Sequence, residues 1–255
     1  MQPRNRALNI AHRGARSLAP ENTILAARRA VAVGADMWEL DVAMTADGEL
    51  VVIHDDSLEG TSNAAEIYPD RAPWQVHTFT LEELRALDFG AWFVAKDPFG
   101  QIAAHTVTAG EQERFSAVPI PTLAEALDFT REYRFKVNVE IKDLSGKPGD
   151  GQVVEKVVAL IDQRNMAAQT MISSFNHEYI VRSRAANANL PTAALIETAV
   201  NDPLALLKRT GAVALNPSLE LAAPELVSAV REAGYDVYVW TVNEETDMRA
   251  MLAAN

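Results

Sequence analysis

Carboxylates alternate with apolar residues in two short segments of the sequence. Residues 38–42 read Trp-Glu-Leu-Asp-Val, so an extended strand places Glu39 and Asp41 on one face. Residues 137–141 likewise set Glu140 apart from an apolar face. Strands flanked by helical segments have both faces covered, so a charged face near a strand end indicates an active site. Three carboxylates in one cavity repel one another, and their oxygen ligands select one divalent cation, Mg²⁺ or Ca²⁺ with Mn²⁺ as an alternative, over Zn²⁺.

Two histidines and two cations accompany these carboxylates. His12 and His54 end the first and third predicted strands, and an imidazole pair can supply a base for one proton and an acid for another near neutral pH. Once a metal offsets the carboxylate charge, the cavity does not need the further positive charges of Arg13 and Lys142. We therefore expect these two residues to bind an anionic substrate. A metal, two cations and two imidazoles together predict phosphoryl chemistry.

Short apolar segments alternate with amphipathic segments along most of the chain. Apolar residues at helical spacing predict helices around 24–31 and over 123–133, 152–164, 177–186 and 224–233. Eight strands are predicted over 8–12, 38–42, 50–54, 137–141, 170–174, 193–196, 213–216 and 237–242. This alternation over 255 residues favours the α/β class and a (β/α)₈ TIM-type barrel. A doubly wound sheet is less favoured because no glycine-rich phosphate loop follows the first strand.

Two places depart from this alternation. Asp47-Gly48 lies between two apolar runs and predicts a two-residue hairpin turn, which would set Asp41 opposite His54 on one face of the ribbon. Residues 57–118 show little periodicity but are too apolar to be disordered. We therefore expect a small insertion after the third strand, an inserted subdomain or lid, within a single catalytic barrel domain over residues 1–255.

Composition excludes several classes of protein. With 23 Lys+Arg against 35 Asp+Glu, the net charge of −12 disfavours nucleic-acid binding. The absence of cysteine excludes disulfides, thiolate metal sites and a cysteine nucleophile. No run approaches the ~18 apolar residues of a membrane span, and the N-terminus lacks the apolar region of a signal peptide. We therefore expect no integral membrane segment and a cytoplasmic location, whereas no feature predicts the oligomeric state.

Nine motifs occur in order along the chain. They are His12-Arg13-Gly14, Pro20-Glu21-Asn22-Thr23, Glu39-Leu40-Asp41-Val42, Thr45-x-Asp47-Gly48, Val52-x-His54-Asp55, Ile120-Pro121-Thr122-Leu123, Val139-Glu140-Ile141-Lys142, Ser173-Ser174-Phe175 and Trp240-Thr241-Val242-Asn243. The set resembles the glycerophosphodiester phosphodiesterase family, among the phospholipase-C-like phosphodiesterase barrels, over residues 8 to about 250.

This resemblance implies a role for each candidate residue. It implies one divalent metal held by Glu39, Asp41 and Glu140, general base and acid catalysis by His12 and His54, and phosphate contacts from Arg13 and Lys142. The implied activity is metal-dependent hydrolysis of a small-molecule glycerophosphodiester to glycerol 3-phosphate and an alcohol, through a cyclic phosphate. The resemblance does not decide which histidine is the first base, nor which alcohol is preferred.

Several alternatives stay open at this point. A lysophospholipase D or sphingomyelinase-D-like enzyme could use the same site, with an apolar rim from residues 57–118 for a lipid substrate. A metal-assisted aldolase or isomerase using Lys142, and a binding module without catalysis, are less favoured. Trp240 is predicted either as a wall of the pocket or as a core residue. Family members usually continue with a further strand where this chain ends at Asn255, so we expect a truncated sequence or a different closure of the barrel.

Overall fold

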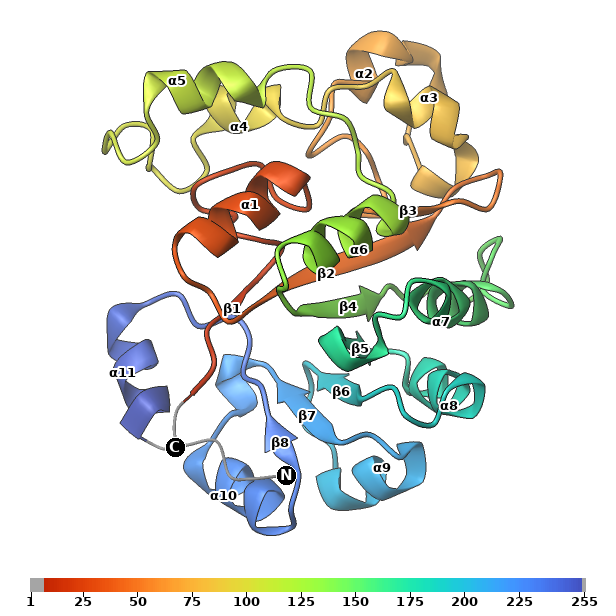
Figure 1. Ribbon diagram of the computed structural model, residues 1–255, viewed down its shortest axis with the longest axis vertical. Coiled ribbons are helices and arrows are strands. Elements are labelled where there is room, and N and C mark those ends of the chain that lie inside the picture. The colour runs from red at the N-terminus through yellow and green to blue at the C-terminus, as the bar shows by residue number, and fades with distance from the viewer. Residues whose placement is uncertain (1–6, 254–255) are drawn as a thin grey trace.

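A curled sheet of mainly parallel strands forms the centre of the protein. The computed structural model describes residues 7–253. In this part of the chain seven strands run parallel, in the order β1-β2-β4-β5-β6-β7-β8 (Figure 1). The strands are β1 (Ile10–Ala11), β2 (Met37–Met44), β3 (Leu50–Val52), β4 (Val137–Ile141), β5 (Thr170–Ser174), β6 (Thr192–Ile196), β7 (Ala214–Pro217) and β8 (Asp236–Val237).

β3 departs from the order expected of a barrel. It pairs with β2 in antiparallel orientation, so it lies off the path of parallel strands. The prediction that counts this strand among the eight barrel strands is therefore wrong. Its apolar residues still contribute to the core, because all three β3 residues are buried.

The register of this hairpin also differs from the prediction. Ile53, not His54, lies opposite Asp41, and its N–H donates to the Asp41 carbonyl at 3.0 Å. The turn is one residue longer than predicted because Thr45 and Glu49 pair across it, with the Thr45 N–H donating to the Glu49 carbonyl at 3.0 Å. A slip of one residue transfers every side chain to the other face of a strand. This rule does not set the direction of the His54 side chain, because β3 ends before His54, at Val52.

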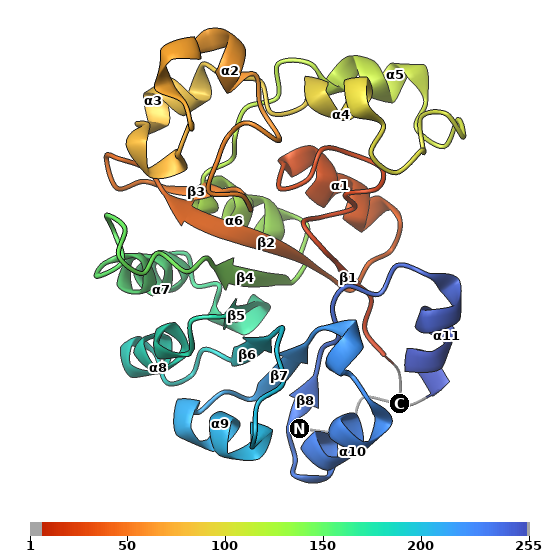
Figure 2. The same ribbon diagram turned by 180° about the vertical axis from the view of Figure 1, so that it is seen from behind.

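Helices cover the outer face of the sheet (Figures 1 and 2). The helices outside residues 57–118 are α1 (Ile24–Ala32), α6 (Leu123–Glu132), α7 (Val153–Gln163), α8 (His177–Ala186), α9 (Pro203–Thr210), α10 (Pro224–Glu232) and α11 (Glu245–Ala253), with 3₁₀ turns η4 (Ala167–Gln169) and η5 (Leu219–Leu221). Thr23 caps α1, since its hydroxyl accepts from the Ala26 N–H at 3.1 Å. Trp38, Leu40 and Val42 of β2 belong to the core cluster between sheet and helices, which leaves the alternate β2 positions for the inner face.

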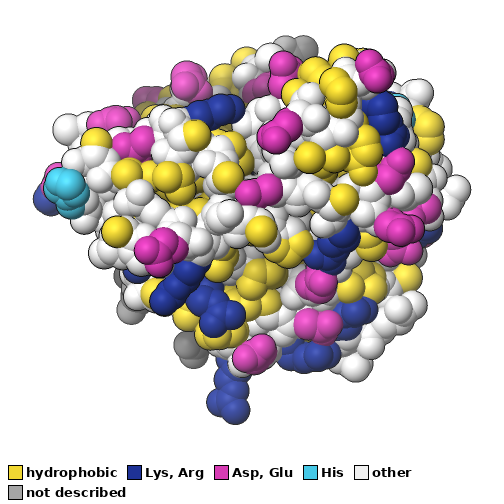
Figure 3. Space-filling view, turned by 90° about the horizontal axis from the view of Figure 1, so that it is seen from above, with side chains coloured by type: hydrophobic (Ala, Val, Ile, Leu, Met, Phe, Trp, Pro, Cys, Tyr) yellow, Lys and Arg dark blue, Asp and Glu magenta, His cyan; other side chains and the backbone are white. Residues whose placement is uncertain are grey.

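Residues 57–118 contain only short helical elements. They are α2 (Ala64–Ile67), α3 (Leu81–Arg85), α4 (Ala91–Lys96), α5 (Ala109–Gln112) and the 3₁₀ turns η1 (Pro69–Arg71), η2 (Val76–Thr78) and η3 (Glu113–Phe115). A core of their own includes Phe79, Leu84 and Phe89, which pack on Val51 and Ile53. Acidic, basic and apolar side chains are interspersed on the outer surface above these elements (Figure 3). We refer to residues 57–118 as the insertion.

The two edge strands of the sheet approach each other at one end. Among the described residues, β1 and β8 pair with no further strand on their outer sides. The Thr241 hydroxyl, beyond β8, nevertheless lies 3.3 Å from Nδ1 of His12, beyond β1. None of the described helices combines the length and apolar character needed to cross a bilayer.

Candidate active site

The parallel pairing of β2 with β4 brings three carboxylates together. Asp41 lies directly beside Glu140 in the ladder, and Glu39 lies two residues earlier on the same face of β2. One ligand oxygen from each of these three residues lies within 4.8 Å of the other two. All three side chains are buried. The cluster therefore follows directly from strand alternation and sheet register.

The electrostatics of this cluster favour a bound cation. Burial and the charge of Asp41 raise the pKa of Glu140, and burial, Asp41 and Glu140 raise the pKa of Glu39 well above its usual range. Glu39 Oε1 and Asp41 Oδ1 are buried without a hydrogen-bond donor among the described residues. Buried anionic oxygens without donors are costly unless they bind a cation, so these three residues suit a metal ion.

Arg13 connects the loop after β1 to the carboxylates. Its backbone N–H donates to Glu39 Oε2 at 2.8 Å, and its guanidinium lies 2.8 Å from Glu21 Oε1 and 3.5 Å from Asp41 Oδ2. Burial alone would lower the pKa of Arg13, but the charges of Asp41 and Glu21 outweigh it and raise that pKa. The loop is tightly folded, because a Cβ on Gly14 would come within 2.7 Å of Ala26.

Lys142 lies at the other side of the cluster, directly after β4. Its Nζ is 3.1 Å from Glu140 Oε1 and 3.7 Å from Asp41 Oδ1. Burial opposes its charge, but Glu140 and Asp41 raise its pKa. Both Arg13 and Lys142 therefore hold their positive charges beside the carboxylate cluster.

His12 borders Glu39 and is largely removed from solvent. Its Nε2 lies 3.9 Å from Glu39 Oε2, while its Nδ1 faces the Thr241 hydroxyl. Burial, together with the nearby charges of Arg13 and Arg16, lowers the pKa of His12 to about 3. In this arrangement the imidazole is neutral at neutral pH and can accept a proton.

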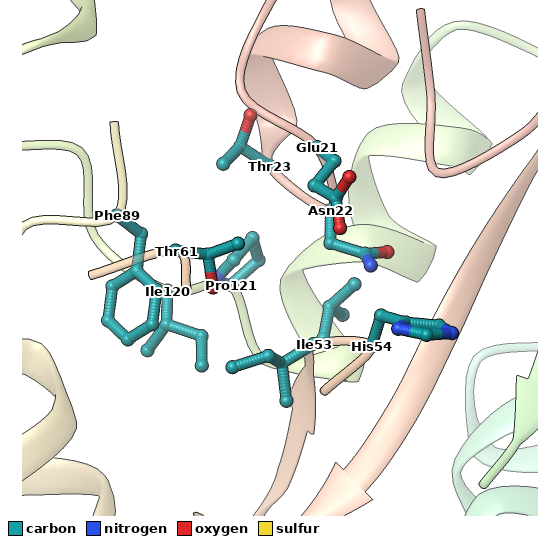
Figure 4. Close-up of a pocket in the computed structure, with 10 residues that line it drawn as sticks. Glu21, Asn22, Thr23, Ile53, His54, Thr61, Phe89, Ile120 and Pro121 are labelled. Atoms are coloured by element: carbon teal, nitrogen blue, oxygen red, sulfur yellow. The ribbon is translucent and has the colours of Figure 1, made fainter. Parts of the chain in front are cut away.

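His54 reaches the site from the segment after β3. Its Nδ1 lies 2.6 Å from Asp55 Oδ1, and its charge interacts with those of His12 and Glu140. The hydrogen bond to His54 is the main reason for the lowered pKa of Asp55. Behind His54 lies a cavity of about 10 Å³ bordered by Asn22 and Thr61 (Figure 4). That volume suits one water molecule and is too small for a substrate.

Comparisons with known proteins decide the family. The sequence pattern of the Glycerophosphoryl diester phosphodiesterase family matches residues 12–255. A glycerophosphodiester phosphodiesterase of Caldanaerobacter subterraneus subsp. tengcongensis is 34% identical over 250 residues, covering 98% of this chain and 91% of that protein. A glycerophosphodiester phosphodiesterase of Bacillus subtilis is 31% identical over 259 residues, covering 97% of this chain and 80% of that protein. The chain belongs to the glycerophosphoryl diester phosphodiesterase family.

Solved structures share the fold. A putative glycerophosphoryl diester phosphodiesterase of Silicibacter pomeroyi aligns with a TM-score of 0.83 at 26% identity, covering 99% of this chain and 88% of that one. A phosphodiesterase of Oleispira antarctica, solved with the product sn-glycerol-3-phosphate, aligns with a TM-score of 0.79 at 24% identity, covering 98% and 90%. The expected α/β class with a TIM-type barrel and the resemblance to this enzyme family are therefore confirmed.

Trp240 lies beyond the end of β8 and contacts a residue of β7 and the residue that follows β5. Its ring meets Phe175 edge to face with centroids 5.4 Å apart, and its indole N–H donates to the Asn216 carbonyl at 2.9 Å. The side chain is half-buried. These contacts suit a core role as well as a pocket wall, so the latter stays a prediction for this family member.

Four residues near the site were given no definite role by the sequence. Asn22 donates to Asp41 Oδ2 at 2.9 Å, and Asp55 and Thr241 contact the two histidines. These three belong to motifs shared with the glycerophosphoryl diester phosphodiesterase family, so their positions were available as a signal. Arg16 lies outside those motifs, and its charge contributes to the lowered pKa of His12.

Proposed function

We propose that this chain hydrolyses glycerophosphodiesters to glycerol 3-phosphate and an alcohol. The observation that carries the proposal is a pair of imidazoles, His12 and His54, beside one buried cluster of three carboxylates. The same cluster engages two cations, Arg13 and Lys142. Relatives at 34% and 31% identity that bear the name glycerophosphodiester phosphodiesterase support this substrate class.

In the proposed reaction, the glycerol 2-hydroxyl attacks phosphorus. Neutral His12 takes the hydroxyl proton as the new O–P bond forms, and protonated His54 gives a proton to the alcohol oxygen as the old P–O bond breaks. Water then opens the cyclic glycerophosphate with the two imidazoles in exchanged roles, so both return to their starting states. The Asp55 carboxylate contacts Nδ1 of His54, which leaves Nε2 free to face the leaving oxygen.

Substrate charge is matched by the chain and by one divalent cation. Glu39, Asp41 and Glu140 would hold this cation, Mg²⁺ or Ca²⁺ with Mn²⁺ as the alternative, because their ligand atoms are all oxygens. When bound, the cation would offset most of the carboxylate charge and would polarise a phosphoryl oxygen. Arg13 and Lys142 bind the remaining phosphate oxygens. We also propose that the insertion forms a lid on a single catalytic domain and that Trp240 lines the pocket. The cytoplasmic location stays a prediction from the sequence.

The test measures glycerol 3-phosphate released from glycerophosphoethanolamine by the purified chain. We expect EDTA to abolish release and Mg²⁺ or Ca²⁺ to restore it. His12→Ala and His54→Ala should each lower kcat by about 10²–10⁴-fold, the usual scale for general acid–base groups. His105→Ala, an exposed histidine of the insertion, is the matched control and should leave kcat unchanged.

Two results would contradict the proposal. One is retained activity in a His12→Ala/His54→Ala variant whose circular dichroism matches that of the unmodified chain. The other is choline release from lysophosphatidylcholine in preference to glycerophosphodiesters, which would indicate a lysophospholipase D.

A further inference from the structure

Arg16 is a half-buried cation beside the carboxylate cluster. It lies in the loop between β1 and α1, and its charge interacts with those of Glu21, Glu39 and Asp41. Within residues 7–253, no carboxylate comes within 4 Å of its guanidinium, whereas Arg13 and Lys142 each lie that close to two. Arg16 therefore differs from the other two cations of the site, because its N–H donors have no anionic partner in the described chain.

Phe99 of the insertion covers the Arg16 guanidinium. The distance from Arg16 Cζ to the ring centroid is 5.4 Å, and Phe99 is 38% exposed. The loop that carries this ring is braced, because the Asp97 carboxylate accepts from the N–H groups of Ile102 and Ala103 at 3.0 and 2.9 Å. A ring over one face orients the guanidinium and leaves the donors at its edge available.

We propose that Arg16 and Phe99 form a subsite for an anionic group on the alcohol of the substrate. The inference rests on the proposed function and extends it to the choice of alcohol. The phosphate is common to all glycerophosphodiesters and belongs at the cluster with Arg13 and Lys142, while the glycerol part carries no charge. The alcohol is the part whose charge varies. A guanidinium without an acidic partner attracts a carboxylate or a second phosphate there and disfavours an alcohol whose only charge is a cation.

Glycerophosphoserine and glycerophosphoethanolamine form a matched pair for testing this subsite. Their alcohols share an ammonium group and differ by one carboxylate. We expect Arg16→Gln to lower the ratio of kcat/KM for the serine diester over the ethanolamine diester by about tenfold, chiefly through KM, the scale of one lost charge-assisted hydrogen bond. Arg16→Lys keeps the charge but loses the planar fork, so it should recover part of the ratio. Phe99→Leu should lower the ratio by a smaller factor, because the guanidinium loses its stacking partner.

Arg114→Gln provides the control, since it removes the same charge from an exposed arginine of the insertion and should leave the ratio unchanged. An unchanged ratio in folded Arg16→Gln, or an equal loss with both diesters, would overturn the inference and leave the proposed function standing. If the unmodified chain hydrolyses neither diester, the proposed function and the inference fail together.

Discussion

Acidic side chains meet opposite electrostatic environments at the candidate active site and in the insertion. At the active site, burial and neighbouring carboxylates raise the pKa values of Glu39 and Glu140. In the insertion, N–H groups of Ala103 and Ile102 lower the pKa of Asp97. A carboxylate that faces N–H donors stabilises the chain around it, whereas carboxylates that face one another require a cation. The net charge of −12 therefore says little about function until each acid is placed.

The difference follows from how each region is built. At the active site, the pairing of β2 with β4 forces Asp41 beside Glu140, so forming the sheet also forms the repulsive cluster. The helices of the insertion have only four to six residues, too few for isolated stability, so caps and side-chain contacts to the backbone must hold them. Capping boxes at Thr80 and Thr108 are two such devices.

The largest effect is expected at the cluster, from Glu140→Gln. This variant keeps the size of the side chain but removes one charge from the proposed cation site, so kcat/KM should fall by about 10³-fold. Because burial and Asp41 disfavour the charged form of Glu140, the metal-free variant should be at least as stable as the unmodified chain. Assays with Mg²⁺ and urea unfolding in EDTA measure the two effects. Glu225→Gln, on an exposed residue of α10, is the control. Equal activity of the two variants would contradict the difference drawn between the clustered carboxylates and carboxylates elsewhere.

A smaller effect is expected from Asp55→Asn. The variant retains an oxygen near His54 Nδ1 but loses the charge that holds the imidazole, so kcat should fall by about 10- to 100-fold. Asp56→Asn is a closely matched control, because Asp56 is exposed and pairs with Lys147 at 2.5 Å. Measured kcat values that fall equally in both variants would show that a general loss of negative charge, rather than orientation of His54, causes the effect.

The smallest effect is expected in the insertion, from Asp88→Asn. Burial opposes ionisation of Asp88, but N–H groups of Gly90, Ala117, Ala91 and Val118 outweigh it and lower its pKa. At pH 7 the variant should lose about 1.5 kcal/mol of the free energy of unfolding, the scale of a hydrogen bond to a charged group. A lowered pKa in the folded state means that this stabilisation is present above the ordinary value of about 3.9 and disappears as pH falls through the folded pKa.

Urea unfolding of the unmodified chain and Asp88→Asn at pH 7 and at about pH 3 tests this dependence. The difference in the free energy of unfolding between the unmodified chain and Asp88→Asn should become smaller at the lower pH. Asp70→Asn, on an exposed carboxylate of η1, should differ little from the unmodified chain at either pH. A gap that widens on acidification would contradict the proposed role of the Asp88 carboxylate.

The regular elements could be predicted because their signals are local. The alternation of apolar and polar residues in β4, the apolar pair Met171-Ile172 in β5 and the helical period of α8 lie within each segment, and the observed bounds match the predicted ones. The hairpin after β2 shows where this fails. Asp47-Gly48 marks a turn, but the bonds between Thr45 and Glu49 lengthen it by one residue and shift the register.

The sequence by itself determined the family, the α/β class and the residue types of the site, because motifs and strand alternation are local features of short segments. Tertiary structure decided which of these residues meet. Sheet register places Asp41 directly beside Glu140. The fold also brings Phe99 over Arg16, although the two residues are 83 positions apart in the sequence. Elements that fold from distant segments decide whether a charged side chain lies beside an acid, an N–H donor or an aromatic ring. These neighbours separate a structural carboxylate from a functional one.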